Sequence, residues 1–127
     1  MPAALNVIHT PSAPAAIGPY SQAIAVNGLV YTSGQIAIDP ATGSIDAKTI
    51  EAQTEQVIAN LKAVLEAAGS DLTKVVKTTG FLQSMGDFAA FNAVYEQYFT
   101  GKPARSCVEV SKLPKGALVE IEAMAVI

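Results

Sequence analysis

The stretch Pro103-Ala104-Arg105-Ser106-Cys107-Val108-Glu109-Val110 is the most informative segment of this chain. Its residues alternate in character, a pattern that is typical of a β-strand. Arg105 is the only arginine in the sequence, and the other seven basic residues are lysines. A guanidinium presents a rigid fork of donors that holds a carboxylate or phosphate at two points. The segment therefore predicts a strand that carries either an anion receptor or an ordinary surface arginine.

A second strand, expected over Leu118–Val126, alternates more strictly. Val119, Ile121, Ala123 and Ala125 point one way, whereas Glu120 and Glu122 point the other way. If helices cover the apolar row, we expect Arg105, Cys107, Glu120 and Glu122 to share the opposite face of the sheet. That face is too apolar to be left exposed to solvent, so we expect it to pack against other copies of the chain. A ligand cleft is then expected at the interface between subunits.

The remaining elements follow from periodicity and turn residues. Asn27-Gly28 predicts a hairpin, and Gly69 stands where a long helix should end. Asp39–Gly43 and Pro114–Gly116 are expected turns. Further strands are expected at Asn6–His9, Ser21–Val26, Leu29–Ile36 and Val75–Leu82, and helices at Thr49–Ala68 and from the cap Asp87 to Phe99. The order βββαβαββ predicts a single α+β domain over residues 1–127, with two helices on one face of a mixed six-stranded sheet.

Composition narrows the classes of function. The chain has 127 residues, a formal net charge of −3, 50% hydrophobic residues and only 15% charged residues. The negative charge disfavours a nucleic-acid partner held by bulk electrostatics, and the shortage of charge favours burial between subunits. One cysteine, no secretory leader and no long apolar run predict a cytoplasmic protein without membrane association. No metal-ligand cluster or phosphate-binding glycine loop is visible, so we expect neither a metal nor an organic cofactor.

Several blocks together resemble the RidA (YjgF-like) family, in family order and over essentially the whole chain. They are Gly18-Pro19-Tyr20-Ser21-Gln22-Ala23, Ser33-Gly34-Gln35-Ile36, Asn60 with Ala67-Ala68-Gly69, the arginine-bearing segment, and Val119-Glu120-Ile121-Glu122-Ala123. The resemblance implies a chorismate-mutase-like fold assembled as a homotrimer, with three pockets between subunits. It also implies 2-iminobutanoate/2-iminopropanoate deaminase activity on the reactive imines and enamines that pyridoxal-phosphate enzymes release, yielding 2-keto acids and ammonia.

The resemblance also implies roles for individual residues. Arg105 matches the residue that binds the substrate carboxylate, and Glu120 matches the one that orients the attacking water. Cys107 matches a position whose backbone carbonyl faces the pocket. The other matched positions line the pocket: Tyr20, Ser33, Asn92 and Gly34, the last with a backbone N–H that can reach the carboxylate.

The chemistry of these side chains also suits this reaction, independently of the family resemblance. Hydrolysis of an imino acid needs the carboxylate held, water aimed at the imine carbon, and protons moved to the leaving nitrogen. Arg105 can supply the first requirement, and Glu120 can supply the second and part of the third. The competing interpretations are that Glu120 is only a structural partner of Arg105 and that Cys107 is a nucleophile, although no second motif supplies a base to activate its thiol.

Two other classes of function stay open. An RNA-directed activity, as an endoribonuclease or translation inhibitor, is suggested for some relatives, and Lys102, Arg105, Lys112 and Lys115 give a local positive bias. A non-catalytic binder of small carboxylates is the second alternative. It needs Arg105 but does not need Glu120.

Overall fold

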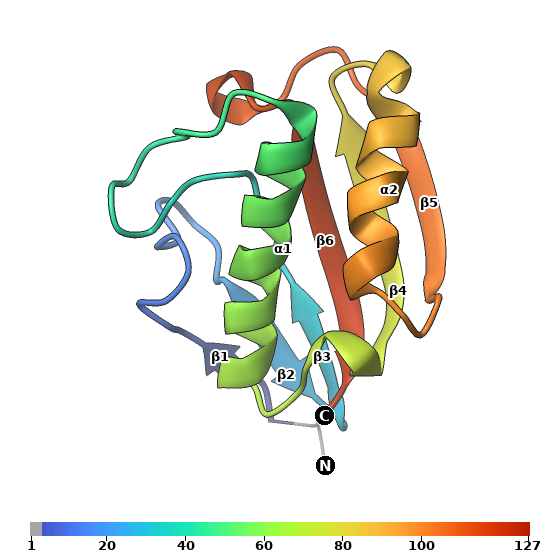
Figure 1. Ribbon diagram of the computed structural model, residues 1–127. Coiled ribbons are helices and arrows are strands. Elements are labelled where there is room, and N and C mark those ends of the chain that lie inside the picture. The colour runs from blue at the N-terminus through green and yellow to red at the C-terminus, as the bar shows by residue number, and fades with distance from the viewer. Residues whose placement is uncertain (1–3) are drawn as a thin grey trace.

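A six-stranded sheet with the order β1-β2-β3-β6-β4-β5 forms one layer of the computed structural model, which describes residues 4–127. Both long helices lie on the same face of this sheet (Figure 1). The strands are β1 (Asn6–Ile8), β2 (Ala23–Val26), β3 (Leu29–Thr32), β4 (Val75–Leu82), β5 (Ala104–Glu109) and β6 (Val119–Val126). The helices are α1 (Ile50–Ala67) and α2 (Phe88–Tyr98), with short 3₁₀ turns at Leu72–Lys74, Met85–Asp87 and Pro114–Gly116.

The mixed sheet and the single helical layer confirm the predicted fold class. β4 and β5 are parallel and are joined through α2, whereas every other pair of neighbouring strands is antiparallel. A parallel pair needs a long crossover, which a helix provides, while antiparallel neighbours can be joined by a tight turn. Asn27 and Gly28 both have positive φ in the hairpin between β2 and β3, as predicted.

The long helix α1 begins and ends as its sequence predicts. The Thr49 side chain accepts a hydrogen bond from the N–H of Ala52 at the N-terminus. Gly69 has φ +86° just after the C-terminus, where a glycine carries no steric penalty. Asp87 is the N-cap residue of α2, as predicted, although its side chain makes no capping bond. Ser84 caps the preceding 3₁₀ turn.

The core lies between the helices and the sheet. Phe91, Ile58, Leu61 and Leu65 of the helices are fully buried against alternate residues of β6. Those strand residues are Val119, Ile121, Ala123 and Ala125, as the alternation predicts. Neither helix in the described part of the chain is long and apolar enough to cross a bilayer.

The first strands are shorter than predicted. β3 ends at Thr32, although its apolar pattern continues to Ile36. Beyond Thr32 the N–H of Ser33 donates to the carbonyl of Gln22, and Gln35 and Ile121 exchange N–H to O hydrogen bonds in an isolated bridge. The segment 33–38 is therefore free to turn away from the sheet and to form part of a pocket.

Burial of Leu61 between the helices and the sheet predicts a large loss of stability on truncation. Leu61 has no exposed surface. Leu61→Ala should lower the free energy of unfolding by about 2–5 kcal/mol, because it removes buried methyl groups and leaves a cavity. Lys62→Ala, at an exposed position of the same helix, is the matched control and should stay within about 0.5 kcal/mol in denaturant titrations. Equal effects of the two substitutions would contradict this description of the core.

Candidate active site

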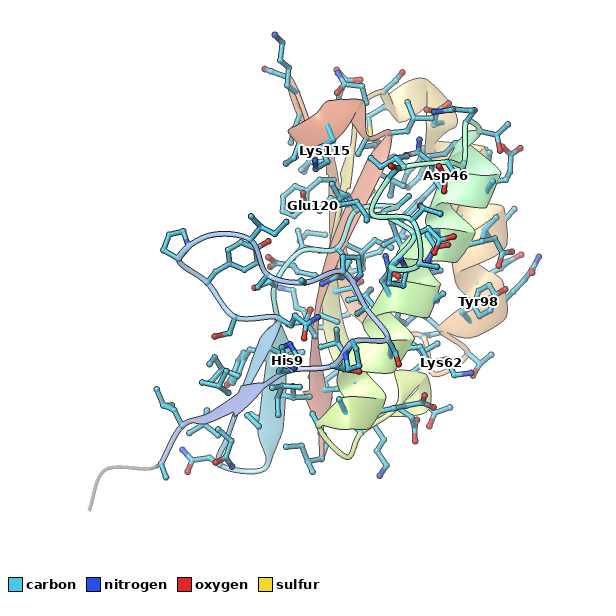
Figure 2. All side chains as sticks on the ribbon, turned by 90° about the vertical axis from the view of Figure 1, so that its left-hand side faces the viewer. His9, Asp46, Lys62, Tyr98, Lys115 and Glu120 are labelled. Atoms are coloured by element: carbon cyan, nitrogen blue, oxygen red, sulfur yellow. The ribbon has the colours of Figure 1, made fainter. Side chains whose placement is uncertain are left out.

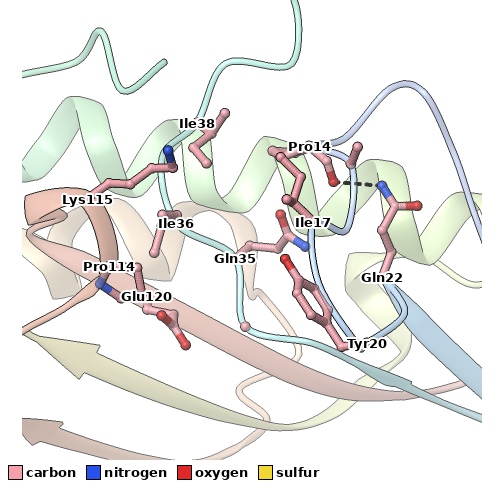
Figure 3. A pocket seen from close by; sticks show the side chains of 12 residues that line it. Pro14, Ile17, Tyr20, Gln22, Gln35, Ile36, Ile38, Pro114, Lys115 and Glu120 are labelled. Atoms are coloured by element: carbon pink, nitrogen blue, oxygen red, sulfur yellow. Dashed lines mark hydrogen bonds between the residues drawn. The ribbon is translucent and has the colours of Figure 1, made fainter. Parts of the chain in front are cut away.

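A pocket of about 320 Å³ lies where three loops meet the N-terminal end of β6 (Figure 3). Tyr20 comes from the loop before β2, Gly34 from the segment after β3, and Glu120 from β6. The walls around these groups are mainly apolar. They consist of Pro14, Ala15, Ile17, Gln22, Gln35, Ile36, Ile38, Pro114 and Lys115. A few polar groups converging in an apolar pocket are the usual composition of a small-molecule site.

Glu120 lies in close contact with the backbone of Gly34. A Cβ atom added at Gly34 would stand 2.8 Å from the carboxyl carbon Cδ and 3.0 Å from Cγ of Glu120. Glycine is therefore required here for the close approach of the carboxylate, since its φ is not in the left-handed region. Gly34 thus permits the position of Glu120 as well as lining the pocket.

The environment of Glu120 changes its acidity. Burial raises the pKa of its carboxyl above the ordinary value of 4.5, and the neighbouring charge of Glu122 raises the pKa further. Both carboxylates lie on the face of the sheet that the helices leave open. In Figure 2, Glu120 and Lys115 lie on the side of the molecule away from Lys62 and Tyr98 of the helices. A carboxylate with a raised pKa is a stronger base than an exposed one and is suited to accept a proton from water.

Arg105 lies in a separate group of residues between β5 and α2. Its Nη1 atom donates a 2.8 Å hydrogen bond to Oδ1 of Asn92. Its guanidinium carbon is 4.8 Å from the ring centre of Tyr95, 5.5 Å from that of Phe88 and 5.7 Å from that of Phe91. Aromatic faces attract a cation and hold its plane, so the guanidinium is oriented while its other N–H donors stay available.

The prediction that Arg105, Cys107, Glu120 and Glu122 share one face of the sheet is wrong. In the strand register Arg105 stands beside Thr78 and Ala123, which are buried under the helices. Cys107 also packs against the helix-side core. Glu120 stands beside Phe81 on the open face. Arg105 packs against the aromatic side chains of α2 on the helix side. The two faces of β5 are therefore the reverse of those predicted, with Arg105 and Cys107 toward the helices and Val108 on the open face.

The candidate residues of the sequence therefore fall into two groups. Tyr20, Gly34 and Glu120 line the pocket, whereas Arg105, Asn92 and Cys107 lie at the edge of the sheet beside α2. Ser33 lies beside the first group, where its hydroxyl donates a 2.6 Å hydrogen bond to the carbonyl of Ser21. Sequence reasoning did not assign pocket roles to Gln22, Gln35, Ile17 or Lys115, although Gln22 and Gln35 lie within the blocks quoted above.

The environment of Cys107 does not favour a thiolate. Burial raises the pKa of its thiol, and the nearby charge of Arg105 only partly opposes that effect. His9, the single histidine, is exposed at the end of β1 and does not line the pocket. Among residues 4–127, no three His, Cys, Asp or Glu side chains gather in a way that could hold a metal ion.

The chain is similar in sequence and fold to known proteins. The family model described as Endoribonuclease L-PSP matches residues 10–127. A RutC family protein of Synechocystis sp. is 55% identical over 126 residues, covering 97% of each chain. A 2-iminobutanoate/2-iminopropanoate deaminase of Salmonella typhimurium is 51% identical over 125 residues, covering 95% of this chain and 97% of that protein.

Solved structures agree with these sequence matches. The crystal structure of YyfA from Yersinia pestis, a protein of the conserved Rid family, has a TM-score of 0.95 and 54% identity, covering 98% of this chain and 100% of that one. The shared architecture is an α+β domain with one mixed sheet and two helices. This chain belongs to the RidA/YjgF family, whose model carries the L-PSP description.

The contact between Gly34 and Glu120 predicts the effect of Gly34→Ala. The new methyl group should push the carboxylate toward solvent, so the pKa of Glu120 should fall toward its ordinary value while the fold is retained. Carboxyl ¹³C NMR titration of Glu120 measures this change. Gly101→Ala is the control, because a Cβ there would meet only an ordinary contact with the carbonyl of Thr73. An unchanged pKa in Gly34→Ala would contradict the proposed close packing.

Proposed function

We propose that this chain is a 2-iminobutanoate/2-iminopropanoate deaminase, which hydrolyses small 2-imino acids to 2-keto acids and ammonia. The observation that carries the proposal is the half-buried carboxylate of Glu120, which lines an otherwise largely apolar pocket and has a raised pKa. The relative named as such a deaminase is 51% identical to this chain.

The proposed reaction needs no group beyond these side chains and water. Glu120 accepts a proton from water as the water oxygen forms a bond to the imine carbon, and it passes this proton to the imine nitrogen, which gives a carbinolamine. Glu120 then takes the hydroxyl proton of the carbinolamine and delivers it to the amino group. The C=O bond forms as the C–N bond breaks, ammonia leaves, and the carboxylate is regenerated. Arg105 holds the substrate carboxylate at two points and so fixes the plane of the imine carbon. General acid–base catalysis of this kind contributes about 10²–10⁴-fold.

A complete site requires two copies of the chain. Within one copy Arg105 points to the helix side of β5 and Glu120 to the open side of β6, so the sheet separates them. β5 is an edge strand, whose outer backbone groups have no partner strand among the described residues. An edge strand that packs against the open face of a neighbour brings the neighbour's Glu120 toward Arg105. A closed ring of three copies gives three equivalent clefts, which is the assembly we propose.

The open face of the sheet has the composition of an interface. Val7, Tyr31, Val108 and Val126 are 66%, 41%, 46% and 44% exposed, and the strand register places all four on this face. Apolar side chains that recur across one face of a small domain mark a surface that another protein covers. Charged residues are also few in the sequence as a whole.

The first prediction from this proposal concerns the activity itself. With 2-iminobutanoate generated in situ, the purified protein should accelerate the release of 2-ketobutanoate after treatment with a chelator and without any added cofactor. Keto-acid formation is followed against the spontaneous rate. A rate equal to the spontaneous one for several small 2-imino acids would contradict the proposed function.

Variants separate catalysis from binding. Arg105→Lys keeps the charge but loses the two-point grip, and a hydrogen bond to a charged group is worth about 1.5–3 kcal/mol. We therefore expect kcat/KM to fall roughly 10- to 100-fold.

Glu120→Gln should still bind 2-ketobutanoate but should lose most turnover, whereas Cys107→Ser should keep substantial activity. Normal turnover in Glu120→Gln together with an inactive Cys107→Ser would instead support a thiol mechanism.

Assembly gives an independent prediction. Light scattering at micromolar concentration should give three times the mass of one chain. Val108→Glu should weaken assembly, because it places a charge on the apolar open face. Lys48→Glu, at an exposed position in the loop before α1, is the control and should leave the mass unchanged. A monomeric wild-type protein would leave Arg105 and Glu120 apart and would contradict the two-copy site.

The same variants can test the RNA-directed alternative. The family model bears the name of an endoribonuclease, and Lys112, Lys115 and Arg105 could contact phosphate. RNA cleavage that falls with Arg105→Lys, and binding that weakens steeply with salt, would favour that alternative over the deaminase. A protein that binds keto acids but turns over neither imino acids nor RNA would be the non-catalytic receptor.

A further inference from the structure

The two apolar walls of the pocket belong to irregular segments of the chain. Residues 13–20 form one wall and residues 34–38 the other, and both lie outside the helices and named strands. Backbone groups in such segments lack a regular hydrogen-bonding ladder, so their inward carbonyls must find other donors. The first wall also has fewer backbone donors, because Pro14 and Pro19 have no N–H group.

Gln22 supplies hydrogen bonds to the first wall. Its Nε2 donates to the carbonyl of Pro14 at 2.8 Å, to that of Thr10 at 3.0 Å and to that of Ala13 at 3.4 Å. Its Oε1 accepts a 2.7 Å hydrogen bond from the N–H of Thr10. The bond to Pro14 is drawn in Figure 3. Gln22 is only 2% exposed, so a single buried amide holds the loop that leads to Ile17 and Tyr20.

Asn60, which lies in helix α1, donates hydrogen bonds to backbone carbonyls of the opposite wall. Its Nδ2 donates to the carbonyl of Ile36 at 3.1 Å and to that of Ile38 at 2.9 Å. Its Oδ1 accepts a 2.9 Å hydrogen bond from Nε2 of Gln56, which fixes the orientation of the amide. Asn60 is 1% exposed, and the two isoleucines that it holds both line the pocket.

We propose that Gln22 and Asn60 are positioning residues of the site: each fixes one wall of the pocket through its backbone, and together they set the distance between the walls. The inference rests on the function proposed above for this pocket. An amide is suited to the task because it both donates and accepts, yet it is uncharged. A lysine could donate to the same carbonyls, but it would bury a positive charge without a partner and could not accept the hydrogen bond from Thr10 or Gln56.

Loss of Gln22 or Asn60 is expected to weaken ligand binding more than it slows the reaction. Loss of either amide leaves buried carbonyls without donors and releases one wall, while the contact between Gly34 and Glu120 is retained. The ligand then loses contacts that it makes equally before and during reaction. Such a loss raises KM and the Kd of a product with little change in kcat.

The experiment compares Gln22→Met and Asn60→Leu with Thr54→Val. Both test variants keep the approximate shape of the side chain while removing its hydrogen bonds. Thr54 is a matched control in α1, since it is fully buried and its hydroxyl donates a 2.7 Å bond to the carbonyl of Ile50 within its own helix. Gln22→Leu serves if Gln22→Met does not fold, because it is also uncharged and also lacks the donors to the three carbonyls.

All of these variants should lower Tm, but only those at Gln22 and Asn60 should affect the ligand. We expect KM for 2-iminobutanoate and Kd for 2-ketobutanoate to rise about 10-fold, with kcat within about twofold of the wild type. Folded Gln22 and Asn60 variants whose KM and Kd stay within about twofold of those of Thr54→Val would overturn the proposal.

The same measurements distinguish failure of the positioning role from failure of the proposed function. If the wild type shows no turnover but binds 2-ketobutanoate, the deaminase proposal fails, and the Kd values alone decide the role of the two amides. If the wild type neither turns over the imino acid nor binds the keto acid, both proposals are overturned.

Discussion

The alternation of β6 is the constraint on which the rest of the structure depends. This strand lies in the middle of the sheet, hydrogen-bonded to β3 and β4, and its odd-numbered residues are buried under both helices. Because successive side chains of a strand point to opposite faces, burying Ile121 forces Glu120 onto the open face. A shift of one residue would bury two carboxylates in the core, so the position of Glu120 is fixed by the same burial that stabilises the fold.

Glu120 and Arg105, the two main residues of the candidate site, are held in position by different contacts. Glu120 is held by close packing against Gly34, and burial raises its pKa. Arg105 is held by aromatic rings and by Asn92 on the other side of the sheet. On the proposed assembly, the substrate carboxylate pairs with Arg105 of the neighbouring copy and neutralises its charge, so the bound ligand preserves the effect of burial on the pKa of Glu120. Assembly, ligand binding and the acidity of the carboxylate would then be linked.

Much of this structure could be predicted from the sequence, because local signals and burial agree. Thr49 and Gly69 bound a helix, Asn27-Gly28 forms a hairpin, and the alternation of β6 gives its two faces. The face of Arg105 could not be predicted in this way. Val108 and Val110 next to it suggest that the apolar row faces the helices, and only the tertiary contacts with α2 show the reverse. The early end of β3 could not be predicted either, because the apolar pattern continues to Ile36, whereas Gly34 and Ile36 line the pocket in the structure.

The central claim is that Arg105 of one copy and Glu120 of another complete each site, and mixing two inactive variants tests it most directly. Arg105→Ala and Glu120→Gln chains are refolded together, and native mass spectrometry verifies that mixed assemblies have formed. Each variant alone should remain near the spontaneous rate. Random mixing should restore roughly a quarter of the sites, because one chain contributes the intact arginine and its neighbour the intact glutamate. Verified mixed assemblies with no gain in 2-iminobutanoate hydrolysis over either variant alone would contradict the account.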